Sequence, residues 1–258
     1  MNLTTRENET RMPSKVPEVM IVFWIIKILC TTVGETAADF LNVNLNFGLT
    51  GTSLVMSAFL AFFLVMQLRS KKYIPWLYWT VVVLVSIVGT LITDNLVDNF
   101  GIALKTTTIA FSLALLVTFL LWHAKENTLS IHSIFTRQRE LFYWAAILFT
   151  FALGTAAGDL VAEGLSLGYA NSALMFGGMI VIVTIAYYGF SANAILAFWI
   201  AYILTRPLGA SVGDYLSQSV GSGGLGLGLA YTNAVFVSAI LALVIYLTVT
   251  RRDAKVMV

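Results

Sequence analysis

Four aspartates recur at fixed positions in an otherwise apolar chain, and each follows the same two residue types. A tryptophan stands 15 residues before each aspartate and a glycine stands five before it, so the pattern W-x9-G-x4-D occurs four times. The tryptophans are Trp24, Trp79, Trp144 and Trp199, the glycines are Gly34, Gly89, Gly154 and Gly209, and the aspartates are Asp39, Asp94, Asp159 and Asp214. Carboxylates bind hard cations such as Mg²⁺, Mn²⁺ and Ca²⁺, and they carry protons. The repeated aspartates are therefore the first candidates for ion-binding or metal-ligating residues.

Further carboxylates accompany three of the four aspartates at a spacing of four residues. The pairs are Glu35 with Asp39, Asp94 with Asp98, and Asp159 with Glu163. In the fourth copy, Gln218 stands four residues after Asp214. Residues four apart share one face of a helix, so each of the three pairs is expected to present two oxygen ligands. Clustered carboxylates repel one another unless protons or a cation neutralise them, and the lack of clustered Cys and His argues against Zn²⁺ or Cu⁺.

Three cationic side chains fall within or beside the apolar segments, namely Lys27, Lys105 and Arg206. Lys105 stands four residues after Gly101, and hydroxyl-bearing residues stand four residues after a glycine at Thr52, Ser172 and Thr232. That spacing predicts that Lys105 faces the acids as a fixed charge. Two interpretations are open for Lys27 and Arg206. They neutralise acids across a helix interface, or they compete with a transported cation and so balance charge or gate the site.

The elements that must hold these residues are membrane-spanning helices. Apolar residues make up 59% of the chain and charged residues 11%, whereas about a quarter of the residues of a soluble domain are charged. Apolar runs long enough to cross a bilayer as helices recur along the chain. The expected spans are 18–39, 48–68, 75–96, 102–123, 140–161, 169–189, 192–213 and 226–249. A seven-span alternative joins the sixth and seventh runs, which only the stretch YYGFSAN separates.

The four motifs divide the chain into four repeats of two spans each. The motif starts are 55, 65 and 55 residues apart, and the repeats cover 18–70, 73–124, 138–190 and 192–250. Two spans return the chain to its starting side, so all repeats share one orientation and are related by an axis along the membrane normal. The sequence therefore predicts a single all-α transmembrane domain over 1–258, with halves 1–124 and 137–258 and a polar tail at 1–17.

The distribution of basic residues predicts the orientation of the chain. Twelve of the 15 Lys and Arg residues flank the spans on one side of the eight-span arrangement, which marks that side and both termini as cytoplasmic. The motif helices then run outward, and each aspartate lies roughly 22 Å along the helix from its tryptophan. The tryptophans are expected to anchor at the inner membrane interface, with packing between repeats as the alternative. The glycines are expected to allow close helix packing.

The four two-span units, each with its tryptophan and the glycine and aspartate that follow, resemble a bacterial four-repeat membrane-protein family of unknown function. The resemblance covers roughly residues 18–250. It implies an all-helical protein of the bacterial cytoplasmic (inner) membrane. It implies no particular activity.

The charged residues favour a membrane transporter of a hard divalent cation of the Mn²⁺ or Mg²⁺ type, with proton exchange as a coupling mode and with the ion as substrate rather than cofactor. One alternative is a transporter or channel for a small organic or anionic solute, steered by Lys27, Lys105 and Arg206. Another is a scaffold or sensor whose charges only join helices. No nucleophile–base pairing, metalloprotease motif or phosphate loop is recognisable, so no enzymatic activity is predicted. The expected partners are the lipid bilayer and a small ion or solute, without nucleic acid, and no oligomeric state is predicted.

Overall fold

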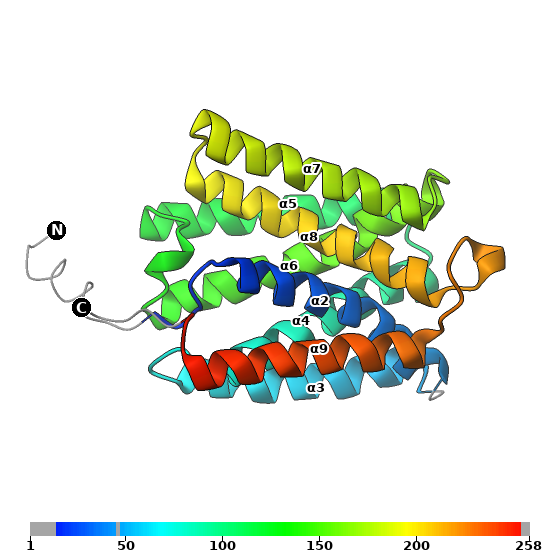
Figure 1. Cartoon of the computed structure of the whole chain (residues 1–258), viewed down its shortest axis with the longest axis horizontal. Coiled ribbons are helices and arrows are strands. Elements are labelled where there is room, and N and C mark those ends of the chain that lie inside the picture. The colour runs from blue at the N-terminus through cyan, green and yellow to red at the C-terminus, as the bar shows by residue number, and fades with distance from the viewer. Residues whose placement is uncertain (1–13, 45–46, 254–258) are drawn as a thin grey trace, which may run out of the picture.

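The computed structural model describes residues 14–44 and 47–253, and its long elements are all helices (Figure 1). They are α2 (Ile21–Asp39), α3 (Gly48–Arg69), α4 (Pro75–Asp94), α5 (Leu104–Glu126), α6 (Arg137–Asp159), α7 (Tyr169–Phe190), α8 (Ala194–Ser217) and α9 (Leu229–Thr250). Among the described residues, eight helical segments are long and apolar enough to cross a membrane. The eight-span prediction is therefore confirmed. The seven-span alternative is wrong, because Ser191 takes a left-handed conformation that ends α7 before α8 begins.

The helices form two layers around a common centre. More than half of each spanning segment that contains α2, α4, α6 or α8 is buried inside the protein, whereas α3, α5, α7 and α9 are mostly exposed on the outside. The inner helices pack in a ring, with α2 against α4, α4 against α6, α6 against α8, and α8 against α2. The first helix of every repeat therefore belongs to the ring, and the second helix covers it.

Each outer helix packs on the inner helix of the following repeat. Thus α3 packs against α4, α5 against α6 and α7 against α8, and α9 closes the arrangement by packing against α2. Figure 1 shows the red α9 beside the blue α2, and the described part of the chain begins and ends at the same end of the molecule, where the Glu18 N–H donates to the Asp253 carbonyl at 2.9 Å. The four parallel repeats expected from the sequence are confirmed, and they are joined by cyclic exchange of their second helices.

The repeated glycines explain how the ring helices approach so closely. A Cβ atom added to Gly34 would lie 2.5 Å from Ser86 Cβ of the next ring helix, and one added to Gly209 would lie 2.6 Å from Thr31 Cβ. Gly89 meets Phe151 and Gly154 meets Arg206 in the same way. In all four contacts the facing residue stands three positions before the glycine of the next repeat. The glycines therefore pack the ring by one repeated contact.

The repeated tryptophans pack between repeats, so the expectation that they anchor at the membrane interface is wrong for three of them. Trp79, Trp144 and Trp199 are 1%, 3% and 4% exposed, and only Trp24 is partly exposed. The aromatic residue before each tryptophan contacts the tryptophan of the next repeat. These contacts join Phe23 to Trp79, Tyr78 to Trp144, Tyr143 to Trp199, and Phe198 to Trp24. A ring of aromatic side chains thus fills the core near the end where the chain termini lie.

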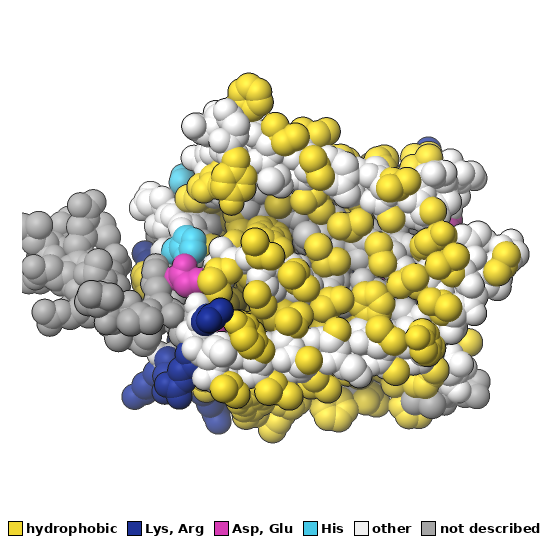
Figure 2. All heavy atoms as spheres, in the orientation of Figure 1, with side chains coloured by type: hydrophobic (Ala, Val, Ile, Leu, Met, Phe, Trp, Pro, Cys, Tyr) yellow, Lys and Arg dark blue, Asp and Glu magenta, His cyan; other side chains and the backbone are white. Residues whose placement is uncertain are grey.

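The surface agrees with a lipid environment around the helices. In Figure 2 hydrophobic side chains cover the middle of the visible face, and Lys and Arg side chains gather at the end where the chain termini lie. Large apolar side chains are exposed along the outer helices, among them Leu54 and Phe62 of α3 and Leu174 and Tyr188 of α7. Exposed apolar surface of this extent is stable in hydrocarbon and not in water. The chain is therefore a multi-pass membrane protein.

Replacement of Gly209 by Ala should destabilise the protein, whereas replacement of Gly178 by Ala should not. A methyl group on Gly209 would meet Thr31 and lie 3.0 Å from the backbone nitrogen of Thr32, so α2 and α8 must move apart. Nothing lies within 4 Å of a methyl group on Gly178, which also lies in a helix. We expect a loss of about 1–3 kcal/mol in the free energy of unfolding for Gly209→Ala. Thermal or SDS unfolding of the purified protein checks this, and equal stability of the two variants would contradict the proposed packing.

Candidate functional site

A single arginine lies at the centre of the helix ring. The Arg206 side chain of α8 is completely buried, and its Nη2 atom donates hydrogen bonds to Glu35 Oε2 at 2.8 Å and Thr155 Oγ1 at 2.7 Å. Nη2 also contacts Thr90 Oγ1. One guanidinium nitrogen therefore joins α2, α4, α6 and α8. Among the described residues, Nε and Nη1 of Arg206 have no hydrogen-bond partner.

The repeat pattern explains why these three residues meet the arginine. Glu35, Thr90 and Thr155 all stand directly after the glycine of their own repeat, so they occupy equivalent places on three ring helices. Arg206 stands three positions before the glycine of the fourth repeat, at a position that faces the ring neighbour. The two threonines were not predicted as site residues. Their place beside the repeated glycine is the sequence signal that could have found them.

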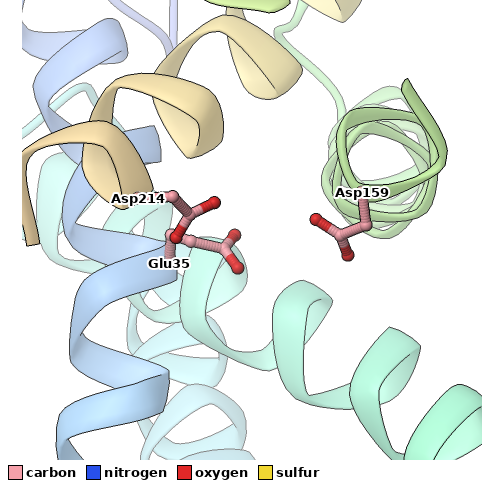
Figure 3. A group of neighbouring side chains, drawn as sticks. All are labelled: Glu35, Asp159 and Asp214. Carbon is pink, nitrogen blue, oxygen red and sulfur yellow. The ribbon is translucent and has the colours of Figure 1, made fainter. Parts of the chain in front are cut away.

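Three carboxylates from three repeats converge beside this arginine. One oxygen from each of Glu35, Asp159 and Asp214 can be chosen so that all three lie within 4.8 Å of one another. Figure 3 shows Asp214 of α8 beside Glu35 of α2, with Asp159 of α6 pointing toward both from across a gap. Glu35 and Asp214 are 6% and 8% exposed, and Asp159 is half-buried. We call Glu35, Asp159 and Asp214 the acidic trio.

The spacing of the acidic trio is close to that of a cation site. Oxygens on opposite sides of a Mg²⁺ ion lie about 4.2 Å apart, and those across a Ca²⁺ ion about 5 Å apart, given metal–oxygen distances near 2.1 and 2.5 Å. Three carboxylates beside one guanidinium also leave two negative charges without a counter-ion. Such a group needs protons or a cation to be stable away from water. The residues of the acidic trio thus fit a hard cation, and Arg206 supplies only part of the charge.

The other two repeated aspartates lie near the acidic trio without belonging to it. Asp39 and Asp94 are half-buried and are the last residues of α2 and α4. The charges of Glu35, Asp159 and Asp39 all lie close enough to act on Asp94. The repeated aspartates therefore share one end of the ring, with two of the four in the tightest group.

The expected oxygen pairs do not face a common centre. Just after the aspartate, α2, α4 and α6 widen into π-helical turns, which are η1 (Phe40–Asn44), η2 (Asn95–Asn99) and η4 (Leu160–Gly164). Asp98 and Glu163 lie in these turns and are exposed, and Glu163 accepts a hydrogen bond from the Tyr169 hydroxyl at 2.9 Å. The wider turn changes the direction of a residue four positions on. Only Glu35, which precedes its aspartate within the α-helix, reaches the trio.

The three predicted cations occupy different places. Lys27 of α2 is completely buried, whereas Lys105 of α5 is exposed at the surface. The expected equivalence of Lys105 with the hydroxyl residues of the other outer helices is wrong. Thr107 stands 13 residues after Asp94, as Ser172 does after Asp159, and both hydroxyl residues are buried. In the first three repeats the buried hydroxyl residue stands 13 residues after the aspartate, and in the fourth repeat, whose connection is longer, Thr232 stands 18 residues after Asp214.

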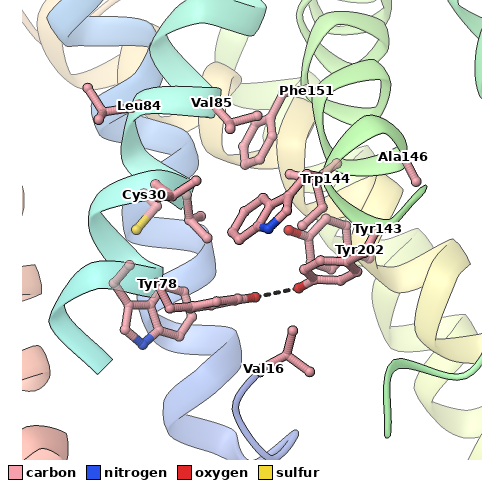
Figure 4. Close-up of a cluster of buried hydrophobic side chains, with 14 of the residues drawn as sticks. Val16, Cys30, Tyr78, Leu84, Val85, Tyr143, Trp144, Ala146, Phe151 and Tyr202 are labelled. Carbon is pink, nitrogen blue, oxygen red and sulfur yellow. Dashed lines mark hydrogen bonds between the residues drawn. The ribbon is translucent and has the colours of Figure 1, made fainter. Parts of the chain in front are cut away.

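The end of the ring near the chain termini is closed. Tyr78 and Tyr143 share a hydrogen bond across the core, as the dashed line in Figure 4 shows. Beyond them, the buried Lys15 donates to Glu140 Oε2 at 2.6 Å, and Gln67 donates to Glu140 Oε1 at 3.0 Å. These contacts tie the segment before α2 to α3 and α6. At the opposite end Glu35 and Asp214 are buried, Asp159 is half-buried, and Asp98 and Glu163 are exposed, so the acidic end is less completely buried than Tyr78, Tyr143 and Glu140.

Fold and site together define a polytopic helical membrane protein in which four equivalent two-helix repeats surround a charged centre. The family description Repeat of Unknown Function (DUF347) matches the chain four times, over residues 22–73, 77–128, 142–193 and 197–253. The chain belongs to this family. No curated protein and no solved structure matches the chain significantly.

Replacement of Arg206 by Met should destabilise the protein more than replacement of Lys27 or Lys105 by Met. The buried acidic trio would then lose its cation, and loss of one partner of a buried ion pair costs about 3–5 kcal/mol. The second change Glu35→Gln should restore part of this stability, because it removes one of the charges left behind. Lys105→Met, at an exposed position, serves as the control. Chemical unfolding of Arg206→Met, of Glu35→Gln, of the two changes combined and of Lys105→Met measures the coupling, and additive effects of the Arg206 and Glu35 changes would contradict the pairing.

Proposed function

We propose that the protein transports a hard divalent cation of the Mn²⁺ or Mg²⁺ type across the bacterial cytoplasmic membrane, with both chain termini in the cytoplasm. The observation that carries the proposal is the convergence of Glu35, Asp159 and Asp214 from three different repeats. Carboxylates within a membrane domain are costly and usually serve transport of ions or protons. Oxygen ligands match hard cations.

Arg206 acts in this proposal as a tethered cation that holds the site when no ion is bound. Its guanidinium takes one of the three carboxylates, at Glu35, and leaves Asp159 and Asp214 free of ion pairs within the described part of the chain. A divalent ion would neutralise the two remaining negative charges of the acidic trio. It would also attract Glu35 away from Arg206. Competition between ion and arginine would then link occupation of the site to a change in how α2 and α8 meet.

The closed aromatic end supports alternating access to the acidic trio. Tyr78, Tyr143 and Glu140 are completely buried at the end that carries the chain termini, while Asp98 and Glu163 are exposed at the other end. An ion could therefore reach the acids from the outer side in this conformation. Release on the inner side would require the Tyr78–Tyr143 and Lys15–Glu140 contacts to open. Rocking of repeated units about a central site is the usual way in which repeat-built transporters achieve this.

The alternatives make different demands on the basic residues. An anionic or small organic solute steered by Lys27, Lys105 and Arg206 is less well supported, because Lys105 is exposed on α5 while the other two are buried. A scaffold or sensor is consistent with the Arg206–Glu35 ion pair. It gives no reason for two additional carboxylates beside that pair.

Substitution of Asp214 by Asn should weaken Mn²⁺ binding, whereas Asp98→Asn should leave it nearly unchanged. The first carboxylate belongs to the acidic trio and the second is exposed outside it. Loss of an outer-shell partner of a metal ligand already reduces affinity by roughly 10- to 100-fold, so loss of a ligand oxygen is expected to reduce it by at least this much. The affinity is measured by the EPR signal of free Mn²⁺ in titrations, and transport by Mn²⁺ uptake into proteoliposomes. Absence of Mn²⁺ and Mg²⁺ flux in the wild type, or equal flux in the Asp214→Asn variant, would refute the proposed transport.

A further inference from the structure

Lys27 of α2 is completely buried and has no carboxylate partner in the described part of the chain. Lys27 Nζ donates one hydrogen bond, to Thr205 Oγ1 at 3.3 Å, and lies 4.3 and 4.2 Å from the ring centroids of Phe151 and Tyr202. In the described part of the chain, no Asp or Glu oxygen lies within 4.0 Å of this atom. Two aromatic faces and one hydroxyl compensate only part of the lost hydration of an ammonium group, so the proton of Lys27 is held weakly and can be given up.

The repeat architecture does not require a charge at this position. Lys27 stands three residues after Trp24, and the corresponding residues of the other repeats are Val82, Ile147 and Tyr202. All four side chains are buried in or beside the same core. Three repeats therefore pack this position with an uncharged side chain, and the lysine is a departure from the pattern that packing alone would not produce.

Lys27 and Arg206 form a pair of unlike cations. Lys27 Nζ lies 4.3 Å and Arg206 Cζ 5.9 Å from the ring centroid of Phe151, so the two cations are neighbours and each disfavours the other's charge. An arginine stays protonated inside proteins, whereas a lysine can give up its proton. Glu35 neutralises Arg206 as long as their ion pair is intact. If a divalent cation takes Glu35, the guanidinium loses its counter-charge and Lys27 is the group that can respond.

We propose that Lys27 is the proton-exchanging residue that couples cation transport to proton movement in the opposite direction. When the divalent cation binds the acidic trio, the N–H bond of the ammonium breaks, the electron pair stays on Nζ, and the proton passes to water on the side from which the cation entered. When the cation leaves on the other side, Nζ takes a proton from water there. This inference rests on the proposed cation transport and adds the coupling ion and the residue that carries it.

The surroundings of Lys27 contain no other group suited to this exchange. The charged or titratable residues that face it are Arg206 and Tyr202 of α8 and Cys30 of its own helix, and α6 presents Phe151. Among the described residues, no ion pair or side-chain hydrogen bond joins Lys27 to α4 or α9. A tyrosine hydroxyl and a cysteine thiol are uncharged at neutral pH in their ordinary states, so Lys27 is the side chain beside Arg206 whose charge can change.

Proton release on cation binding tests the assignment. Purified protein in weakly buffered detergent solution, with a pH-sensitive dye, is titrated with Mn²⁺ and the protons released per bound ion are counted. We expect the wild type to release about one proton more than Lys27→Met or Lys27→Arg, since neither replacement can exchange a proton at Nζ. The control Lys125→Met, at an exposed position of α5, should release as many as the wild type. Equal release from wild type and both Lys27 variants would overturn the assignment.

Two further measurements separate the possible failures. In proteoliposomes the wild type should export protons as Mn²⁺ enters, and the Lys27→Met variant should lose this proton flux. Proton flux driven by Mn²⁺ in the Lys27→Met variant would overturn the assignment and leave the proposed transport intact. Absence of Mn²⁺ binding and flux in the wild type would overturn both. A measurement on unaltered protein does not depend on the folding of a variant. The Nζ resonance of a buried lysine in ¹⁵N-lysine-labelled wild type should shift on addition of Mg²⁺, and no shift would contradict the exchange.

Discussion

A guanidinium group buried inside a membrane domain must be neutralised, and this constraint organises the centre of the protein. Arg206 cannot lose its charge, so the surrounding helices supply one carboxylate and two hydroxyl groups at hydrogen-bonding distance. The three partners come from three repeats and converge only because the ring is closed and in register. Assembly of the ring and neutralisation of the charge are therefore one event, and neither is stable without the other.

The symmetric contacts build the ring, and the departures from symmetry give it chemistry. Glycine–neighbour and aromatic–tryptophan contacts recur four times with the same spacing, and Arg206, which faces Gly154, is the one charged residue among them. Glu35, Arg206 and Lys27 each occupy a position that holds an uncharged residue in the other repeats. The protein thus resembles a uniform scaffold in which duplication supplied four equivalent helices and substitution then made their central side chains different.

Much of the fold could be predicted from the sequence, because membrane spans and repeats leave direct signals. Apolar length indicates the helices, and the fixed spacing of Trp, Gly and Asp indicates four parallel units. The spacing also predicts that the four glycines face equivalent neighbours. It does not indicate which helix supplies that neighbour, since this depends on the order of the inner helices around the ring. An aromatic residue near the end of a span is compatible with an interfacial belt and with an aromatic core, so the sequence does not distinguish these two places for the tryptophans.

The site could be predicted only in part. The spacing of the aspartates and Glu35 marks them as candidates. A π-helical turn directs Asp98 and Glu163 outward, and the spacing of the acidic residues does not indicate such a turn. Thr90 and Thr155 look like ordinary membrane-helix threonines until Arg206 is placed beside them. Counting from a glycine misplaces Lys105, because Gly101 stands seven residues after its aspartate whereas Gly48 and Gly168 stand nine residues after theirs. The sequence does not indicate that Asp159 and Asp214 meet Glu35 while Asp39 and Asp94 do not, because this depends on how the inner helices are placed in the ring.

Because α9 packs on α2, each repeat contacts its neighbours in the same way, whichever repeat comes first along the chain. The backbone N–H of Glu18 donates to the carbonyl of Asp253 at 2.9 Å, so the first and last described segments are already neighbours. Every repeat gives its second helix to the next one around the ring, and the fourth gives its helix to the first. A chain that began at the second or third repeat and joined the present ends would make the same interfaces. The ring is thus circularly permutable in principle, and its four sectors differ in their central side chains and in the turns that follow the inner helices.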